Sequence, residues 1–500
     1  MPSRASASTW SSRAPARAAS TVTRRWVSLS FCVTSLDCTS QFGGSIGHQD
    51  STHNCHRPRR SYSGRPQRRH LDGIRRSARC GHDRRGREYP SGARPAIAGS
   101  GVAGVPNRGR QYQRGAANHH HRRAAELARL PAGLRDPAVQ RPGAGRNSPV
   151  NARPPANFAS DNVAGALPEV IAAVTDAAQA DAMPYGNDPW TERVTARLRG
   201  LFESDLWAFP VATGTAANAL ALSAVCPPFG TVFCHALSHA TTDECGAPEF
   251  YTGGAKLTLV DGPDGRIDPV ALAAAIAVAR PHGVHNMPPA AVTVTQASEA
   301  GTVYAADHLE AIAAIAKENG LVLHMDGARF GNALAALDVS AADATWRRGV
   351  DVLSFGATKG GAMAAEAVVF FREELAAAFG ERRKRGGHLL SKMRFVSAQL
   401  DGYLSGDAWL RAARAANAGA ARLAAGLAAT DGVALVREPE ANIVFAQLPL
   451  PVLDALEADG FGFYRAGDEG SVRLVVPWSV TEADVDGFVA AVRGHLADVD

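Results

Sequence analysis

The sequence predicts an α/β fold built on a mostly parallel β-sheet, followed by a smaller α+β domain. Two apolar runs, residues 321–324 and 351–355, stop abruptly at Gly-containing turns and are separated by a helix-like segment. Runs of this kind are typical of consecutive buried strands in an α/β sheet. Apolar runs alternate with Ala-rich segments along residues 207–371, and this rhythm predicts right-handed crossovers between parallel strands.

The predicted elements follow one another in a regular order after residue 157. Strands are expected at 207–211, 231–234, 257–260, 291–295, 321–324, 351–355 and 367–371. Helices are expected at 168–180, 193–202, 219–225, 268–278 and 304–319. A long Ala-rich helical stretch at 395–429 then precedes strands at 443–448 and 472–476 and helices at 452–459 and 482–496. We therefore predict a large domain at 157–396 and a small C-terminal domain at 397–500.

Residues 1–150 differ sharply in composition from the rest of the chain. They hold 27 Arg, no Lys and 7 acidic residues, whereas residues 151–500 hold 26 basic and 41 acidic residues. The segment has almost no apolar periodicity. Because it cannot bury enough surface to offset the entropy cost of ordering, we predict that it is disordered.

Several explanations of this extension are open. It could be a basic arm that binds nucleic acid, or an organelle transit peptide, since it is rich in Arg and Ser and poor in acids. The His119-His120-His121 tract and the scattered cysteines lack zinc-site spacing, so we expect no metal site. A Lys-free, Arg-rich stretch is also typical of a start codon assigned too far upstream in GC-rich DNA. We favour this last explanation and assign the segment no function.

Composition also bears on the cellular compartment. No apolar run approaches the roughly 18 residues of a membrane span, so we expect a soluble protein without a membrane partner. The cysteines after residue 150, Cys226, Cys234 and Cys245, have no disulfide-framework spacing, which favours a reducing cytoplasm.

The chemistry-bearing residues gather where two predicted strands end. Asp326 and Arg329 follow the strand at 321–324, and Lys359 follows the strand at 351–355. Sheets of this class place their ligands in the crevice outside the strand carboxyl ends. Asp-Gly is also common turn chemistry, and a Lys flanked by Gly is usually an exposed loop residue. Together, however, an amine for a Schiff base and a carboxylate for a pyridinium nitrogen indicate a pyridoxal 5′-phosphate (PLP) site.

Other segments offer weaker signals. Gly214 and Thr215 begin a helix directly after a strand, and free backbone N–H groups there could hold a phosphate. His239 follows another strand and could lie over an aromatic cofactor or carry protons, although most such histidines are surface residues. Arg473 lies within an apolar strand, where pattern alone slightly favours a solvent-facing side chain. The basic run at 382–388 could attract a phosphate, but a solvated charge run is commoner.

Six motifs distributed over residues 157–500 point to one family. They are Ser160-Asp161-Asn162, Tyr185-Gly186-Asn187-Asp188-Pro189, Thr213-Gly214-Thr215-Ala216-Ala217-Asn218, His239 with Glu244, His324-Met325-Asp326-Gly327-Ala328-Arg329, and Thr358-Lys359-Gly360. In these motifs the chain resembles the L-threonine aldolases of the low-specificity type. These are fold type I PLP-dependent enzymes, whose fold is aspartate-aminotransferase-like. Residues 1–156 have no counterpart in that family, which agrees with a misassigned start.

The resemblance implies a role for each cofactor-site residue. Lys359 would hold PLP covalently, and Asp326 would pair with the pyridinium nitrogen. His239 would stack on the cofactor ring and could act as the base. Gly214 and Thr215 would bind the phosphate.

For the substrate and the neighbouring subunit, the resemblance implies four further residues. Arg394 would reach the phosphate of a neighbouring subunit. Ser160, Arg329 and Arg473 would bind the substrate carboxylate, the arginines bidentately, which reverses the solvent-facing expectation for Arg473. Many family members carry a second active-site His where this chain has Glu299. The preference for threonine or allo-threonine therefore stays open.

The expected function is PLP-dependent aldol cleavage of L-threonine, L-allo-threonine and related β-hydroxy-α-amino acids to glycine and an aldehyde. The alternatives are a phenylserine aldolase, another fold type I enzyme such as a β-eliminating lyase or aminotransferase, and an Arg-rich nucleic-acid-binding protein with an inert α/β body. The resemblance also implies a cytoplasmic homodimer or homotetramer that binds a small amino acid and no nucleic acid.

Overall fold

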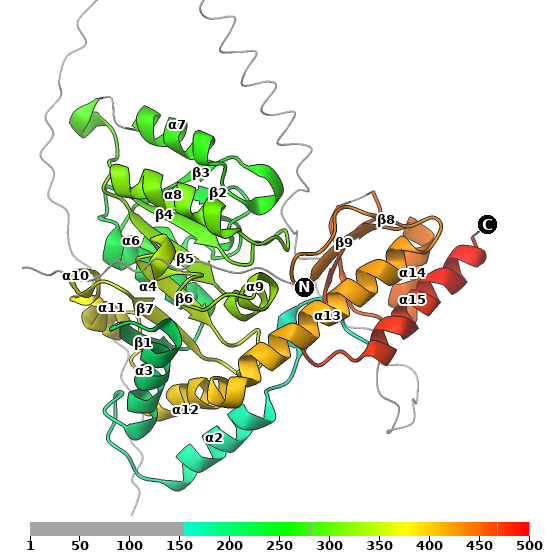
Figure 1. Cartoon of the computed structure of the whole chain (residues 1–500), viewed down its shortest axis with the longest axis horizontal. Helices are drawn as coiled ribbons and strands as arrows, with labels where there is room; N and C mark the ends of the chain where they lie inside the picture. Colours follow the sequence, from blue (N-terminus) through cyan, green and yellow to red (C-terminus); the bar gives the residue numbers. More distant parts are fainter. Residues whose placement is uncertain (1–154, 280–281, 468, 500) are drawn as a thin grey trace, which may run out of the picture. The chain divides into compact units, whose positions relative to one another are not determined.

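The structure is a computed structural model that describes residues 155–279, 282–467 and 469–499 (Figure 1). The predicted disorder of residues 1–150 and the His119-His120-His121 tract lie outside the described residues. The described part contains two β-sheets, one of seven strands and one of four strands.

The larger sheet has the spatial order β1-β7-β6-β5-β4-β2-β3. Its strands are β1 (Trp207–Val211), β2 (Thr231–His235), β3 (Lys256–Val260), β4 (Pro289–Thr295), β5 (Val322–Gly327), β6 (Val352–Gly356) and β7 (Glu366–Phe370). Strands β3, β2, β4, β5 and β6 are parallel, whereas β7 is antiparallel to both β6 and β1. The predicted α/β fold with a mostly parallel sheet is confirmed. All strands except β7 therefore end at the same edge.

The strands read as apolar runs because the sheet is covered on both faces. Every residue of β2, β6 and β7 is buried. His324 lies in the middle of this sheet, and its ring bonds across two strand pairs, to Thr293 Oγ1 at 2.8 Å and Ser354 Oγ at 3.0 Å. Burial lowers the pKa of His324 to about 4. This histidine is thus a neutral cross-strand link.

Helices cover the larger sheet and the segments around it (Figure 1). They are α2 (Pro168–Gln179), α3 (Pro189–Phe202), α4 (Gly214–Val225), α5 (His239–Thr242), α6 (Ala247–Thr252), α7 (Pro269–Ala279), α8 (Ala306–Glu318), α9 (Phe330–Leu337), α10 (Glu373–Ala376), α11 (Phe379–Arg385) and α12 (Arg394–Tyr403). Helix α4 is buried along residues 216–223. Thr213 precedes the helix as its N-cap, and its hydroxyl accepts a hydrogen bond from Ala216 N.

The smaller sheet has the order β10-β11-β9-β8 and is antiparallel throughout. Its strands are β8 (Ala434–Leu435), β9 (Ile443–Gln447), β10 (Tyr464–Arg465) and β11 (Ser471–Val475), and its helices are α13 (Ala408–Ala428), α14 (Leu450–Ala458) and α15 (Glu482–Ala497). The division into domains at residue 397 stays a prediction. In the structure, α12 and the beginning of α13 contribute to the larger apolar core, and the rest of α13 packs in the smaller one.

The helical stretch predicted over 395–429 is two helices rather than one. Helices α12 and α13 are separated by a 3-10 turn, Ser405–Asp407. Gly406 and Asp407 adopt left-handed φ values of 55° and 56°, a conformation that interrupts an α-helix. The Ala-rich pattern of the sequence does not reveal this break. The turn Ser405–Asp407 is only three residues long, and the apolar periodicity continues on both sides of it.

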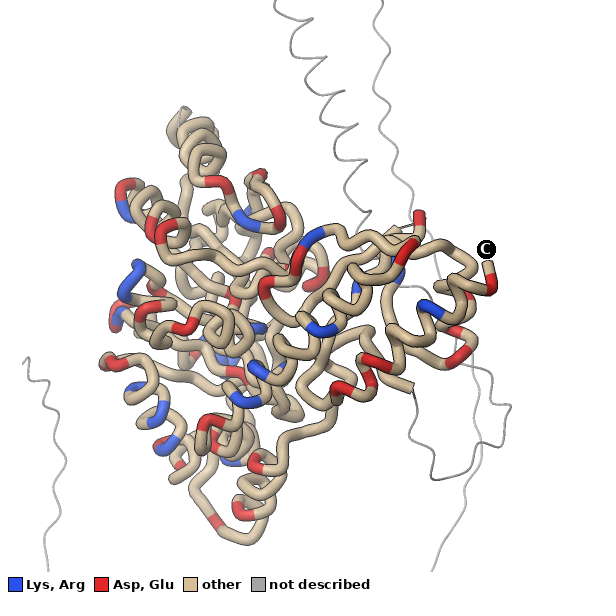
Figure 2. The backbone as a smooth tube through the Cα atoms, turned by 45° about the vertical axis from the view of Figure 1, so that its right-hand side comes forward, with Lys and Arg blue, Asp and Glu red and all other residues tan. Residues whose placement is uncertain are grey.

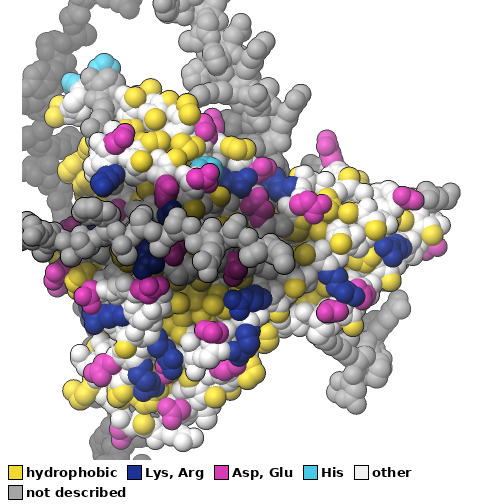
Figure 3. All heavy atoms as spheres, viewed as in Figure 1, with side chains coloured by type: hydrophobic (Ala, Val, Ile, Leu, Met, Phe, Trp, Pro, Cys, Tyr) yellow, Lys and Arg dark blue, Asp and Glu magenta, His cyan; other side chains and the backbone are white. Residues whose placement is uncertain are grey.

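The surface carries charges of both signs. Figure 2 shows acidic and basic residues interspersed along much of the described chain. Figure 3 shows hydrophobic side chains gathered over α7, where Val270 and Val278 are 77% and 75% exposed. Within the described ranges, no helix combines the length and the apolar character that a membrane span requires.

Candidate active site

Asp326 and Lys359 meet at the carboxyl edge of the larger sheet. Asp326 belongs to β5 and pairs in register with Ser354 of β6, and Lys359 follows β6 directly. Burial lowers the pKa of the Lys359 amine, and the nearby Arg329 guanidinium lowers it further. Among the described residues none hydrogen-bonds this amine. A partly buried amine that loses its proton readily is suited to act as a nucleophile.

A chain of hydrogen bonds connects Asp326 to His239. Asn218 of α4 donates through Nδ2 to Asp326 Oδ2 at 2.8 Å and to Glu244 Oε1 at 2.9 Å. Glu244 Oε1 in turn lies 3.0 Å from His239 Nδ1. Asp326 Oδ1 also accepts a bond from Ala328 N at 3.0 Å. The Asp326 carboxylate is therefore held in one orientation from two sides.

The contact with Glu244 favours the protonated form of the His239 ring. It raises the pKa of the His239 ring, against the effects of burial and of the Lys359 charge, and burial raises the pKa of Glu244. Because Nδ1 faces the carboxylate, Nδ1 carries the hydrogen in the neutral ring. Nε2 is then the basic nitrogen, and it bonds to no described residue. The His239 side chain is 35% exposed, which keeps it accessible.

Glu299 holds the backbone at the beginning of helix α5, where His239 lies. Its Oε1 accepts bonds from His239 N at 2.7 Å and from Thr295 Oγ1 at 3.0 Å, and its Oε2 is buried without a partner in the described part. Burial raises the pKa of Glu299, and Asp326 adds to this shift. The glutamate at this position thus fixes the backbone that carries His239.

Of two arginines influenced by the Asp161 charge, only Arg329 bonds to it. Arg329 donates through Nε to Asp161 Oδ2 at 2.7 Å, and both residues are buried. Asn442 donates to the other Asp161 oxygen at 2.7 Å. Burial lowers the pKa of Arg473 to about 10, with Arg329 adding to the effect and Asp161 opposing it. Arg473 makes no ion pair or hydrogen bond with a described residue. This excess of positive charge is suited to bind a carboxylate.

The beginning of α4 has unused backbone donors. Gly214 N and Thr215 N bond to no acceptor among the described residues, whereas Ala217 N already bonds to Thr213 O. A side-chain Cβ at Gly214 would meet nothing within 4 Å, so the space around it is open. Free N–H groups and the positive end of the helix dipole favour an anion here.

The remaining predicted residues lie in different surroundings. Ser160 caps a short 3-10 helix, Asp161–Val163, and its hydroxyl accepts from Asn162 N at 3.2 Å. Arg394 donates through Nε to Ala177 O of α2 at 3.1 Å, and its guanidinium lies over the Phe395 ring. No described contact joins Arg394 to the strand-end cluster, which consists of Asp326, Lys359 and the residues bonded to Asp326. The proposed role of Arg394 across a subunit boundary stays a prediction.

One residue at this edge was missed by sequence reasoning. Glu366 begins β7, and its Oε2 accepts from Ala357 N at 2.7 Å in a buried position. The signal was present, since residues 366–370 read as a carboxylate at the start of an otherwise apolar strand.

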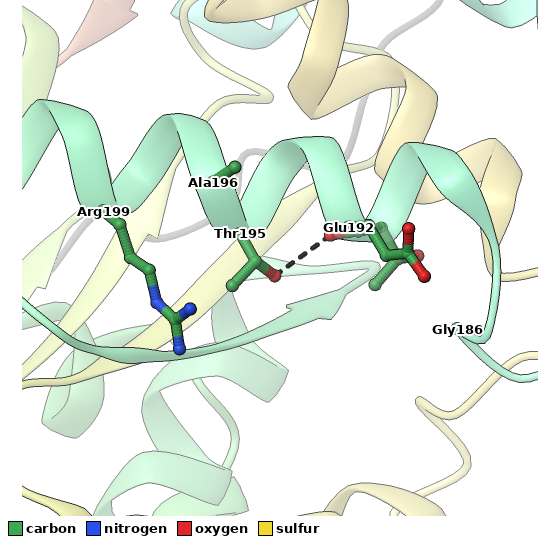
Figure 4. A pocket seen from close by; sticks show the side chains of 6 residues that line it. Gly186, Glu192, Thr195, Ala196 and Arg199 are labelled. Carbon is green, nitrogen blue, oxygen red and sulfur yellow. Dashed lines mark hydrogen bonds between the residues drawn. The ribbon is translucent and has the colours of Figure 1, made fainter.

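A surface depression lies apart from these residues. A shallow pocket along α3 is lined by Gly186, Thr191, Glu192, Thr195, Ala196 and Arg199 (Figure 4). In Figure 4 the Thr195 hydroxyl bonds within its own helix, to the Thr191 backbone. None of these six residues belongs to the strand-end cluster, so this depression plays no part in the candidate site.

A family model described as beta-eliminating lyase matches residues 157–450. The chain belongs to this lyase family. Two curated relatives are each described as a low specificity L-threonine aldolase. The one from Pseudomonas aeruginosa is 47% identical over 321 residues, which cover 64% of this chain and 92% of the relative. The one from Pseudomonas sp. is 45% identical over 340 residues, which cover 68% of this chain and 98% of the relative.

A solved structure agrees with these relatives. The threonine aldolase of Leishmania major matches with a TM-score of 0.64 and 28% identity, covering 68% of this chain and 99% of that one. The predicted resemblance and the fold type I architecture are therefore confirmed. This lyase depends on PLP, and the residues present fit the cofactor chemically. The strand-end edge holds an amine with a lowered pKa, an oriented carboxylate and free helix N–H groups.

Proposed function

We propose that this lyase cleaves L-threonine, L-allo-threonine and related β-hydroxy-α-amino acids to glycine and an aldehyde. The observation that supports this most directly is the Asp326–Asn218–Glu244–His239 chain beside Lys359. With His239 as the base, this chain would bring the base to the same edge that carries the cofactor groups.

Four groups of this chain would hold PLP. Lys359 would bind it covalently through its amine, and the fixed carboxylate of Asp326 would pair with the ring nitrogen. The free N–H groups of Gly214 and Thr215 would bind the phosphate, and the His239 ring would lie against the cofactor ring. When bound, the cofactor supplies an electron sink for the bond broken at the substrate Cα.

The arginines orient the amino acid. Asp161 occupies Nε of Arg329, which leaves its two Nη groups for a substrate carboxylate. Arg473 adds a second guanidinium without a competing acidic partner, and Ser160 contributes a hydroxyl. A carboxylate held at two points restricts rotation about the Cα bonds, so the Cα–Cβ bond can be aligned for cleavage.

His239 moves the proton. Its Nε2 takes the hydrogen of the substrate β-hydroxyl, while Nδ1–H continues to donate to Glu244 and so stabilises the charged ring. Loss of this proton converts the hydroxyl carbon into the aldehyde carbonyl as the Cα–Cβ bond breaks, and Cα must then gain a proton to give glycine. Glu299 keeps His239 in place through the backbone bond.

The test is a reaction without an amino acceptor. The purified chain is incubated with L-threonine and PLP, and glycine and acetaldehyde are quantified. Equal amounts of the two products are expected. 2-Oxobutanoate with ammonia, or a requirement for a keto acid, would instead indicate an eliminating lyase or an aminotransferase. A strong preference for phenylserine would keep the reaction and change the substrate.

The assembly and the compartment are part of the same proposal. We propose a cytoplasmic homodimer or homotetramer in which Arg394 reaches the phosphate site of a neighbouring subunit. Its position at the beginning of α12, apart from the other candidate residues, supports this role. Sedimentation of the wild type and of Arg394→Ala, with cofactor affinity measured for both, tests it. An oligomer whose cofactor affinity is unchanged in the variant would contradict it.

A further inference from the structure

Glu366 lies between the two segments that hold the cofactor in the proposed function. As the first residue of β7, it pairs in register with Val211 at the end of β1 and with Gly356 at the end of β6. Strand β1 leads into the loop before Gly214, and β6 leads into the turn that carries Lys359. A carboxylate at this junction is close to both segments.

The contacts of Glu366 are directed at the Lys359 turn. Its Oε2 accepts from Ala357 N at 2.7 Å, two residues before Lys359. The Thr358 hydroxyl and the Lys359 charge also stabilise its ionised form. The other titratable group that faces it is Tyr403 of α12, since β1 and β6 consist of residues that do not titrate.

The turn that carries Lys359 does not require a charged group to accept the hydrogen bond from Ala357 N. Glu366 is only 6% exposed, and burial raises its pKa to about 7. A glutamine would offer Ala357 N the same acceptor oxygen without the desolvation cost of a charge. What the glutamate adds is a negative charge on the carboxylate that anchors the Lys359 turn at Ala357 N. This charge raises the pKa of the Lys359 nitrogen.

We propose that Glu366 is a positioning residue for Lys359, anchoring its turn through Ala357 N–H and holding a proton on the Lys359 nitrogen. The inference rests on the proposed function, in which Lys359 carries the cofactor. Arg329 repels a positive charge at this nitrogen, and Asp161, Asp326 and Glu366 oppose that repulsion.

The test is a pH titration of the cofactor absorbance in the loaded full chain. Wild type, Glu366→Gln and Glu366→Asp are titrated from about pH 5 to about pH 10, where a lysine-bound cofactor changes protonation. The midpoint should fall by about one pH unit in Glu366→Gln, because a charge near the nitrogen is lost. It should stay near the wild-type value in Glu366→Asp. The control is Glu374→Gln, which removes an exposed charge on α10 and should leave the midpoint unchanged.

Kinetics provide a second measurement. Because Glu366 acts through Lys359 and touches no substrate group, kcat for threonine should fall in Glu366→Gln, with KM changing by less than about twofold. If Glu366→Gln does not fold, Thr358→Val removes the hydroxyl that stabilises the carboxylate and should lower the midpoint in the same direction.

Failure of the inference can be separated from failure of the proposed function. Borohydride reduction followed by peptide mapping shows whether the cofactor is attached to Lys359 in each variant. A cofactor attached elsewhere would overturn the proposed function. Attachment at Lys359 with an unchanged midpoint in Glu366→Gln, or in Thr358→Val where that variant is used, would overturn the role of Glu366 alone.

Discussion

Arg329 and Asp161 form a buried ion pair, with Nε and Oδ2 2.7 Å apart, although the two residues are 168 positions apart in sequence. Arg473, the other arginine beside them, has no acidic partner in the described part. The two arginines thus share a proposed role and differ in structural surroundings, and this difference leads to the first prediction.

Arg329→Met and Arg473→Met should both raise KM for threonine by about tenfold to a hundredfold, since each removes a charged bond to the substrate carboxylate. Only Arg329→Met should lower stability, by about 3 kcal/mol, because it leaves Asp161 buried without its partner. Thermal unfolding of both variants measures this. Equal losses of stability would contradict the assignment of the ion pair.

Lys359→Ala should abolish the visible absorbance of bound PLP and lower cleavage by about a thousandfold or more, because this amine is the proposed covalent attachment point. Absorbance spectra and glycine release are the measurements. Lys256→Ala, at an exposed position of β3, is the matched control and should behave like wild type. Near-normal turnover in Lys359→Ala would refute the proposed function.

The acidic limb of the pH–activity profile, where activity is lost as pH falls, should reflect protonation of the His239 ring. The ring must be neutral to accept a proton, and Glu244 raises its pKa above the ordinary value of 6.5. Activity should therefore increase as pH rises through this raised value. In Glu244→Gln the pKa of His239 should fall and the limb should move to lower pH, with a smaller kcat from weaker orientation of the ring.

A control for this shift exists in the same chain. His495 Nε2 lies 2.7 Å from Asp459 Oδ2 in an exposed histidine–carboxylate pair. Asp459→Asn should leave the pH profile of kcat unchanged. If the acidic limb in Glu244→Gln stays at the wild-type pH, His239 is not the base.

Asn218→Leu should weaken cofactor binding, by about tenfold, because Asp326 Oδ2 and Glu244 Oε1 lose their shared donor. It leaves two buried carboxylates facing each other without their shared donor. Equilibrium titration with PLP measures the affinity. An affinity equal to wild type would show that Ala328 N alone is sufficient to orient Asp326.

Removal of residues 1–150 should leave threonine cleavage unchanged, because every candidate residue lies between Ser160 and Arg473. Activity of the shortened chain is compared with the full chain under the same cofactor concentration. Salt-dependent nucleic-acid binding, measured on both, distinguishes the alternative of a basic arm. Loss of cleavage in the shortened chain would show that the extension contributes to the enzyme.

By itself, the sequence determined the order along the chain of the strands of the larger sheet and the identity of the groups at the strand ends. Short apolar runs and Gly-containing turns are local signals, so Asp326 and Lys359 could be placed at neighbouring strand ends before any coordinates were known. The resemblance in six short motifs then predicted the family, which is confirmed. These features depend on residues close together in the chain.

Only the tertiary structure decided which side chains meet. Asn218 joins Asp326 across 108 positions and Asn442 joins Asp161 across 281 positions, and Glu366 reaches the Lys359 turn because β7 lies between β1 and β6. Such pairings depend on the spatial order of the strands and on helix packing, which apolar periodicity does not encode. Periodicity reports whether a residue is buried, whereas hydrogen-bond partners depend on the three-dimensional neighbours of that residue.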